Sequence, residues 1–452
     1  MQDQLLPSTA SLHLDEAREN SLRTVRELLR GEQRVRYAAV VDDLFGRISI
    51  ALWLAPGGSS TDEFVEALRR RLVSSCGPYW TGTVTCSDAA EPASDPDVFL
   101  RTVWTEGRPD VEIPRLSVND RHRHHLGWFS GWPDSPPLWP ADQGPPVLVF
   151  HGFKGGAGRT TLLASYALAC ASLGQHVLVL DMDLDAPGVG KLLAADSRGT
   201  TARWGVVDFL LEARHKLPLA DYFHVAEHRV GPGRIEVVPA GQLDDAYLTK
   251  LARVELESRT TVAAQPLGQL LNRVKSELNP NVVLIDGRAG LSPAAGILLS
   301  GMAHLHVLVA TTNSQSMLGL ERVIRHLGYE QASRDIRQRD CVVVQAHVPE
   351  TVAAAEIAKR YFSSHVERFF RDGYYAQTRT EDDRTWTIED LDSEIAPHVP
   401  VPISYRVRLA HFERLDDVVG ALIDDAEYKA FHSRINERLG KSRPTSDGVD
   451  DG

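Results

Sequence analysis

Residues Val149 to Gly188 read VFHGFKGGAGRTTLLASYALACASLGQHVLVLDMDLDAPG. A short apolar run, Val147–Phe150, leads into a glycine-rich turn, and a helical pattern over Thr160–Leu173 follows the turn. A second apolar run, His176–Leu180, ends in acidic residues. A glycine-rich turn between a strand and a helix presents backbone N–H groups and the positive end of the helix dipole to an anion. The segment therefore predicts a phosphate-binding loop, with a turn that binds no ligand as the alternative.

The loop departs from the common pattern G-x-x-x-x-G-K-[ST], which would require glycine at position 153 and lysine at position 159. The chain has Phe153 and Arg159 there. Arginine is always charged and can hold phosphate oxygens bidentately, but it is bulkier than lysine and aims its donors differently. Thr160 stands where a hydroxyl can bind Mg²⁺, and Thr161 stands where one can reach an α-phosphate. Three glycines would let the backbone wrap closely around phosphates, where a Cβ would collide: Gly155, Gly156 and Gly158.

The segment FKGGAGRTT resembles the deviant Walker A loop, K-G-G-x-G-[KR]-[ST]-[ST], of the MinD/ParA class of P-loop ATPases. It is nearest to a subgroup whose loop reads F-K-G-G-V-G-R-T, in which arginine recurs at the position of Arg159. The resemblance implies ATP and Mg²⁺ as cofactors and makes Lys154 the catalytic signature lysine of the class. The nucleotide-binding residues that it implies here are Lys154, Gly155, Gly156, Ala157, Gly158, Arg159, Thr160 and Thr161.

The segment VLVLDMDLDAPG resembles the second strand and first switch of the class, D-x-D-x-[DEQ]-A-P-G. The resemblance implies that Asp181 closes the strand and that Asp183 is the catalytic group that orients the attacking water. Asp185, beside it, is the weaker candidate for that role. Carboxylates that only cap strand ends are the alternative, although three at alternating positions after a buried strand are unusual.

The segment VVLIDGRAGLSP resembles the Walker B strand and second switch. By that resemblance Asp286 holds Mg²⁺ through water, and Gly290 offers its N–H to the γ-phosphate. Arg288 would pair with switch carboxylates or with a partner chain, and a purely structural role is equally open. The metal ligands implied are Thr160, Asp183 and Asp286.

The resemblance extends from Pro146 to about Tyr428 and is weak between the motifs. In CVVVQAHVP, Gln345 stands where the class usually has an asparagine that faces the base, and a glutamine amide can make similar hydrogen bonds. The stretch VPVPISYRVRLA, which contains Tyr405, resembles the late loop that packs on the base. Residues 371–395 look like an insertion and are a candidate partner contact.

The chain beyond Pro146 alternates apolar runs with helical stretches. Near-continuous apolar strands that alternate with helices predict an α/β domain, a mostly parallel sheet covered by helices on both faces. We expect this domain to span residues 146–440, followed by a disordered tail over 441–452. The expected strands are Val147–Phe150, His176–Leu180, Ile235–Val238, Val282–Ile285, His306–Ala310 and Cys341–Val344.

We identify no family resemblance for the part before Pro146. Residues 1–113 predict a small α+β domain without a cluster of catalytic groups, and hence an interaction role. Residues 114–145, rich in tryptophan and proline, predict a linker, since prolines interrupt regular structure. Three histidines in this linker favour a solvated loop over a metal site: His122, His124 and His125. Within 1–113 we expect helices over 12–30 and from Thr61 through Val73, and strands over Val35–Val41, Ile48–Leu54, Thr81–Cys86 and Val98–Trp104.

Composition limits the function classes. The chain has 452 residues and a formal net charge of −12, which argues against nucleic acid as a partner. None of its four cysteines forms a C-x-x-C pair, which fits a reducing cytoplasm. We expect no signal peptide, and the longest apolar run, Ala294–Ala310, is shorter than the ~18 residues of a transmembrane span. Ala426–Leu439 is only weakly amphipathic, which argues against a membrane partner.

These observations predict a Mg²⁺-dependent ATPase, a phosphoric-anhydride hydrolase of slow turnover. We expect a homodimer with nucleotide at the interface that regulates a partner protein through residues 1–113 or 371–395. The resemblance places such proteins in bacterial signalling or conflict and defence systems. Two alternatives stay open: a scaffold that holds ATP or ADP with little or no hydrolysis, and a ParA/MinD-like positioning ATPase.

Overall fold

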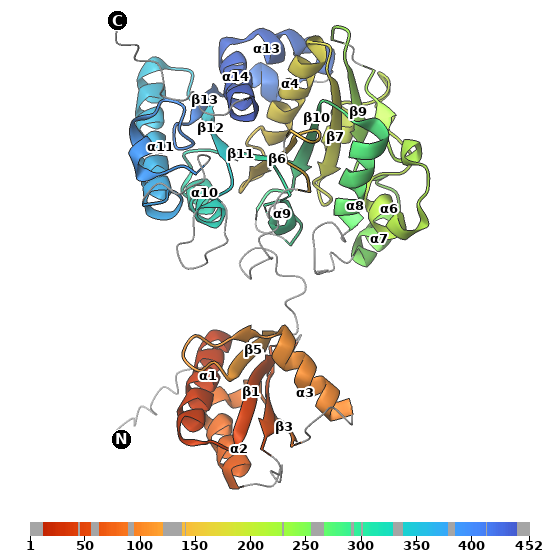
Figure 1. Ribbon diagram of the computed structural model, residues 1–452. Coiled ribbons are helices and arrows are strands. Elements are labelled where there is room, and N and C mark those ends of the chain that lie inside the picture. Colours follow the sequence, from red (N-terminus) through yellow and green to blue (C-terminus); the bar gives the residue numbers. More distant parts are fainter. Residues whose placement is uncertain are drawn as a thin grey trace, which may run out of the picture. The chain divides into compact units, whose positions relative to one another are not determined.

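The structure is a computed structural model with two compact units, Met1–His124 and His125–Gly452 (Figure 1). Each unit is a sheet with its own apolar core. The structure describes residues 12–43, 46–55, 63–88, 95–120, 138–140, 142–227, 230–254, 266–290, 293–299, 302–328, 338–377, 385–412 and 414–440. Among these residues, no helix combines the length and the apolarity needed to cross a bilayer.

The first unit is built on a five-stranded sheet in the order β3-β2-β1-β5-β4. Strands β1 and β2 form an antiparallel pair, while β5 and β3 run parallel to β1 and β2 respectively. Alternate side chains of β1 enter two cores: Val40 packs with the core that includes residues of α1 and α2, and Val41 packs with α3 on the opposite face. The elements are α1 (Leu14–Gly31), β1 (Val35–Asp42), β2 (Ile48–Leu54), α2 (Glu63–Cys76), η1 (Gly77–Tyr79), β3 (Trp80–Ser87), α3 (Asp95–Glu106), β4 (Arg108–Pro109) and β5 (Leu116–Asp120).

Two expectations for this unit are wrong. Residues Val98–Trp104 belong to helix α3, not to a strand, because Leu100 and Val103 turn a helical face to the sheet while the Thr102 hydroxyl donates to the Val98 carbonyl. Residues Leu116–Asp120 form strand β5 within the expected linker. This strand pairs with β1, so the ordered unit continues beyond residue 113. His122, His124 and His125 lie outside the described residues.

The second unit contains an eight-stranded sheet in the order β13-β12-β11-β6-β10-β7-β9-β8. All neighbouring pairs are parallel except β8 with β9. The six expected strands are therefore confirmed, whereas β8 and β13 were not expected from the sequence. The strands are β6 (Val147–Gly152), β7 (His176–Met182), β8 (His224–Val225), β9 (Arg234–Val238), β10 (Val282–Gly287), β11 (Leu305–Ala310), β12 (Cys341–Val348) and β13 (Val401–Ser404).

Helices cover both faces of this sheet (Figure 1). Phe150 of β6 points to the side of α4, α13 and α14, whereas Val149 points to the side of α6 and α8. The helices of eight residues or more are α4 (Arg159–Ser172), α8 (Pro266–Arg273), α10 (Ser314–Leu327), α11 (Val352–Gly373) and α14 (Ala426–Leu439). The shorter ones are α5 (Val189–Leu192), α6 (Val206–Glu212), α7 (Tyr247–Arg253), α9 (Pro293–Leu298), α12 (Val407–Ala410), α13 (Val419–Asp424) and the turns η3 (Ala213–His215), η4 (Leu219–Tyr222), η6 (Val274–Leu278), η7 (Ile388–Asp392) and η8 (Leu415–Asp417).

The expected insertion, residues 371–395, packs into the domain where the structure describes it. Tyr374, Tyr375 and Trp386 are buried in the core beside α10 and α11. The Gln338 amide donates to the carbonyls of Tyr374 and Trp386, which ties the two ends of the segment together. The described part of this segment is therefore a structural layer of the domain.

Candidate nucleotide site

The glycine-rich loop joins β6 to α4 at the carboxyl edge of the sheet. Gly156 and Gly158 have φ angles of 77° and 82°, a left-handed conformation that side chains strain. A Cβ built on Gly155, Gly156 or Gly158 meets no atom within 4 Å, so the loop faces open space on that side. This open side lies beside the first turn of α4, where backbone N–H groups have no helical partner and favour an anion.

Strand order explains why Asp183 and Asp286 lie close to Arg159 beside this loop. Strand β10 lies between β6 and β7, so the carboxyl ends of all three meet at one edge. Arg159, in the first turn of α4, bridges two carboxylates there: its Nε lies 2.6 Å from Asp286, and a terminal nitrogen lies 2.7 Å from Asp183. The Thr160 hydroxyl donates to the second oxygen of Asp286 at 2.7 Å. The structure therefore brings four of the expected site residues into one contiguous network.

Burial controls the electrostatics of this network. Arg159 is 9% exposed and Asp286 is 1% exposed. Burial lowers the pKa of Arg159, but the attraction of Asp286 and the hydrogen bond to Asp183 outweigh it, so the pKa of Arg159 is raised overall. Burial raises the pKa of Asp286 despite Arg159 and Thr160. A buried ion pair of this kind costs desolvation energy and leaves a strongly unfavourable charge if one partner is removed.

The same oxygen atoms form a donor set suited to magnesium. One hydroxyl and two carboxylates are the hard oxygen ligands that Mg²⁺ takes in nucleotide sites. In this structure the two carboxylates already hold a positive group, the Arg159 guanidinium. The residues Thr160, Asp183 and Asp286 therefore fit a cation, provided that Arg159 moves off the carboxylates.

The first switch is fixed by Asp181. Its carboxylate accepts hydrogen bonds from the backbone N–H groups of Asp183, Gly188 and Gly190 at 3.1–3.3 Å. Burial, followed by the negative charge of Asp286, raises the pKa of Asp181 to about 7. Asp181 thus holds the loop that carries Asp183.

The second switch is bound to both the loop and the first switch. The Gly290 N–H, expected to face the γ-phosphate, donates to the Gly152 carbonyl at 3.0 Å. It can reach a phosphate only after that bond opens. Arg288 pairs with Asp185 at 2.7 Å, which realises one of the two partners expected for it. Both residues of that pair are more than a third exposed.

Three of the remaining loop residues, Phe153, Ala157 and Thr161, pack against the domain, whereas Lys154 is exposed. Ala157 is buried in the core, and Thr161 lies half-buried in the first turn of α4. Phe153 packs on Gly319 of α10, where an added Cβ would lie 1.9 Å from the phenyl ring. Lys154 is exposed and makes no hydrogen bond or ion pair with any residue that the structure describes. This packing of Phe153 on α10 was not expected from the sequence.

The expectation for Gln345 is wrong in this structure. Its side chain is 1% exposed and donates to the Ala358 carbonyl of α11, so it does not face an open site. A register irregularity follows between Gln345 and Val348, and His347 within it has a φ of 58°. This re-aims the strand end, and the exposed His347 ring lies 5.2 Å from the Tyr405 ring. No pattern in the sequence marks the irregularity, so His347 was not predicted.

Comparisons with known proteins find similarity over parts of this chain. A profile of the family described as cellulose biosynthesis protein BcsQ matches residues 146–187. The antiactivator FleN of Pseudomonas aeruginosa is 36% identical over 94 residues, which cover 21% of this chain and 29% of FleN. The septum site-determining protein MinD of Bacillus subtilis is 24% identical over 185 residues, which cover 41% of this chain and 60% of MinD.

Two further comparisons involve another curated relative and a solved structure. The ESX-1 secretion-associated protein EspI of Mycobacterium tuberculosis is 28% identical over 227 residues, 49% of this chain and 30% of EspI. A solved structure of pNOB8 ParA bound to nonspecific DNA aligns with 65% of this chain and 98% of its own, with a TM-score of 0.42 and 14% identity. The chain spans less than a third of the length of FleN and of EspI. Over the matched segments, the second unit is similar to the MinD/ParA class of P-loop ATPases.

Proposed function

We propose that this protein binds ATP and Mg²⁺ at the loop 154–161 and hydrolyses ATP slowly, as a dimerisation switch that regulates a partner protein. The observation that carries the proposal is the convergence of Arg159, Thr160, Asp183 and Asp286 beside an open glycine loop. Phosphoryl transfer to water depends on positioning and on charge neutralisation more than on covalent chemistry. This network contains groups for both tasks.

Arg159 links the phosphates to the two switches. In the structure it neutralises Asp183 and Asp286. Phosphate oxygens compete for the same guanidinium, because they too accept bidentate, charge-assisted hydrogen bonds. Transfer of Arg159 to phosphate would free Asp286 to hold magnesium with Thr160, and Asp183 to orient water. Magnesium, when bound, would neutralise charge on the phosphates.

This exchange is also the reason to expect slow turnover. Each binding event must open an ion-pair network in which both aspartates are buried. The free energy needed to separate such groups is taken from the binding of ATP. The same observation favours the second candidate function, a scaffold that binds nucleotide and hydrolyses almost none.

The base-binding end of the site involves His347 and Tyr405 in our proposal, in place of Gln345. Strand β12 lies two strands from β6, a separation of about 10 Å at the usual strand spacing. The exposed rings of His347 and Tyr405 offer faces for a base at that distance. Aromatic stacking tolerates different bases, so the preference for adenine is open to measurement.

Thermal melting of the full chain with ATP·Mg²⁺, ADP·Mg²⁺ or GTP·Mg²⁺, followed by phosphate-release assays, tests the proposal. A ligand that binds only the folded state adds about 2.7 kcal/mol of stability at a hundredfold excess over Kd. We expect a rise in Tm with ATP and slow release of phosphate. No shift at millimolar nucleotide in a folded protein would refute ATP binding, whereas a shift without turnover would select the scaffold.

A further inference from the structure

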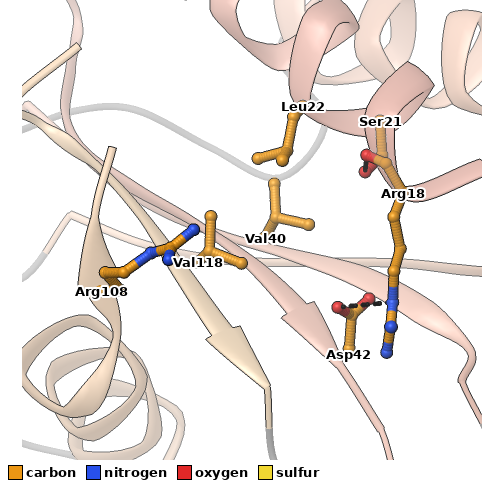
Figure 2. A pocket seen from close by; sticks show the side chains of 7 residues that line it. All are labelled: Arg18, Ser21, Leu22, Val40, Asp42, Arg108 and Val118. Carbon is orange, nitrogen blue, oxygen red and sulfur yellow. Dashed lines mark hydrogen bonds and ion pairs between the residues drawn. The ribbon is translucent and has the colours of Figure 1, made fainter. Parts of the chain in front are cut away.

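The first unit contains a cleft that the proposed ATPase does not use. It lies between α1 and the strands β1, β4 and β5 and has a volume of about 200 Å³ (Figure 2). We propose that this cleft binds a small molecule that carries a phosphate or a carboxylate group, held mainly by Arg108 and Arg18. The residues that line it are Arg18, Ser21, Leu22, Val40, Asp42, Arg108 and Val118.

The cleft follows from the way the helices cover the sheet. Val118 of β5 is the register partner of Val40 on one side and of Arg108 on the other. Burial decreases along this row: Val40 is buried, Val118 is half-buried and Arg108 is exposed. Strand β4, at the sheet edge, is only two residues long. A trough therefore remains between α1 and the edge of the sheet, with apolar walls from Leu22, Val40 and Val118.

At one end of the trough, the guanidinium of Arg18 is held in place by an ion pair. Asp42, at the end of β1, is 4% exposed, and its carboxylate lies 3.1 Å from Nε of Arg18 on α1. The Arg18 side chain keeps 32% of its surface exposed. The buried Ser21 hydroxyl donates to the Arg18 carbonyl at 2.7 Å. The ion pair with Asp42 restricts the rotamers of the Arg18 side chain before a ligand arrives, which lowers the cost of binding.

Arg108 supplies the second cation and faces the first across the trough. Figure 2 shows its guanidinium beside Val118, directed toward the middle of the cleft. The Arg108 guanidinium makes no hydrogen bond or ion pair with any residue in the described part of the chain. Two nearby acidic groups are already paired, because Asp110 accepts hydrogen bonds from Nε and a terminal nitrogen of Arg26, and Glu112 pairs with Arg26 and Arg30.

The charges in the cleft select the ligand. Two guanidinium groups and one carboxylate leave one excess positive charge among the lining residues. A phosphate or carboxylate complements it, since both groups accept bidentate hydrogen bonds from arginine. The volume is below the ~300–1,000 Å³ of drug-sized pockets, so the ligand is small or inserts only its anionic end. The site does not depend on the proposed ATPase activity. A small anionic metabolite would bind to the first unit there.

Hydrogen–deuterium exchange of the full-length protein tests the site locally. The probes are sodium phosphate and sodium succinate at millimolar concentration, against sodium chloride of equal ionic strength. We expect slower exchange in peptides from α1 and from residues 107–118 with at least one probe. Peptides from residues 152–165 report anion binding at the nucleotide loop separately, so failure of one site leaves the other measurable.

Three variants make the test specific. Arg108→Ala should abolish the protection at the cleft, and Arg108→Lys should restore part of it, because lysine keeps the charge but loses the fork of donors. Arg101→Ala, an exposed arginine on α3 outside the cleft, should leave it unchanged. Melting curves confirm that each variant is folded. Absence of protection with both probes, or equal protection in folded Arg108→Ala, would overturn the proposal.

Discussion

At the scale of single residues, Arg159 determines the character of the candidate site. A planar guanidinium donates to two separate carboxylates from different nitrogen atoms in a fixed geometry, whereas all three donors of a lysine ammonium lie on one nitrogen. In this structure those carboxylates belong to Asp183 and Asp286. The residue that departs from the common loop pattern is therefore the one that couples the loop to both switches.

Replacement of Arg159 by methionine keeps much of the side-chain length and removes the charge. We expect Arg159→Met to lower the free energy of unfolding by about 3–5 kcal/mol at neutral pH, because two buried carboxylates lose their partner. Urea denaturation measures the change. The matched control is Arg288→Met, which breaks the half-exposed pair with Asp185 and should cost about 1 kcal/mol or less. Equal losses in both variants would show that burial of the Arg159 network carries no special weight.

The roles of Asp183 and Asp185 can be distinguished by replacing each one with asparagine. If Asp183 orients the attacking water, Asp183→Asn should retain ATP and reduce phosphate release on the order of 10²-fold or more. Asp185→Asn should change release little, because Asp185 is exposed and pairs with Arg288 outside the network. Nucleotide binding by melting and turnover by phosphate release give the two readouts. The assignment is wrong if Asp185→Asn is the slower variant.

Asp181 gives the stability a specific pH dependence. Its pKa is about 7 in the folded protein against an ordinary value of 3.8, so between these values the folded state holds a proton that the unfolded state releases. The free energy of unfolding should therefore fall as pH rises from about 4 to 7. Asp181→Asn cannot ionise and should flatten this part of the profile, while Asp185→Asn should not. Chemical denaturation at several pH values distinguishes the two.

At the scale of elements, the sequence was informative where one physical requirement acts alone. Apolar runs such as Val282–Ile285 must be buried on both faces, and this predicted the central strands of the second sheet. The strand predicted at α3 was wrong because Val98, Phe99 and Trp104 have high strand propensities. The spacing of Leu100 and Val103 instead places both on the helical face that packs on the sheet. The conformation at the end of β12 was not predicted, because the irregularity at His347 depends on tertiary packing.

Glycines of the phosphate-binding loop differ in whether their backbone conformation requires a glycine. Gly158 has a φ of 82° and Gly155 does not have a positive φ, although a Cβ on either one meets no atom within 4 Å. Gly158→Ala should therefore lower the free energy of unfolding by about 1–2 kcal/mol without ligand. Gly155→Ala should leave stability nearly unchanged but weaken ATP binding, if phosphates occupy the open side. Melting with and without ATP·Mg²⁺ measures both, and unimpaired ATP binding by Gly155→Ala would place the phosphates elsewhere.

At the scale of the whole molecule, the two units differ in how far their sequences predict them. The second unit has motifs whose glycines, threonine and carboxylates perform one chemical task, so site and fold could be inferred together. Arg159, Thr160, Asp183 and Asp286 were brought together as expected, but their pairing with each other could not be read from spacing. The first unit has no such motif. Its cleft depends on how far α1 covers β5, which only the assembled sheet determines.

The exposed ammonium of Lys154 leads to a prediction for the assembly. The loop already carries Arg159, and two cations on the same oxygens of one nucleotide would repel each other. Arg159 is buried in its own chain, whereas Lys154 is exposed with no partner among the described residues, so it is free to contact phosphates bound by a second chain. A triphosphate offers more negative charge for this contact than a diphosphate does. ATP should therefore favour the dimer and hydrolysis should release it.

Light scattering of Asp183→Asn with ATP, with ADP and without nucleotide tests this mechanism in a background that retains ATP. We expect the mass to double with ATP only. Adding Lys154→Ala should leave ATP binding by the monomer intact and prevent the doubling, because no cation then crosses to the other nucleotide. Lys429→Ala removes an exposed lysine on α14, far along the chain from the loop, and should dimerise normally. Two results would contradict the mechanism: a molecular mass that does not change with nucleotide, or a normal ATP-dependent dimer in the Lys154→Ala protein. Either would assign Lys154 to phosphates of its own chain, since an ammonium needed only within one subunit affects binding and not assembly.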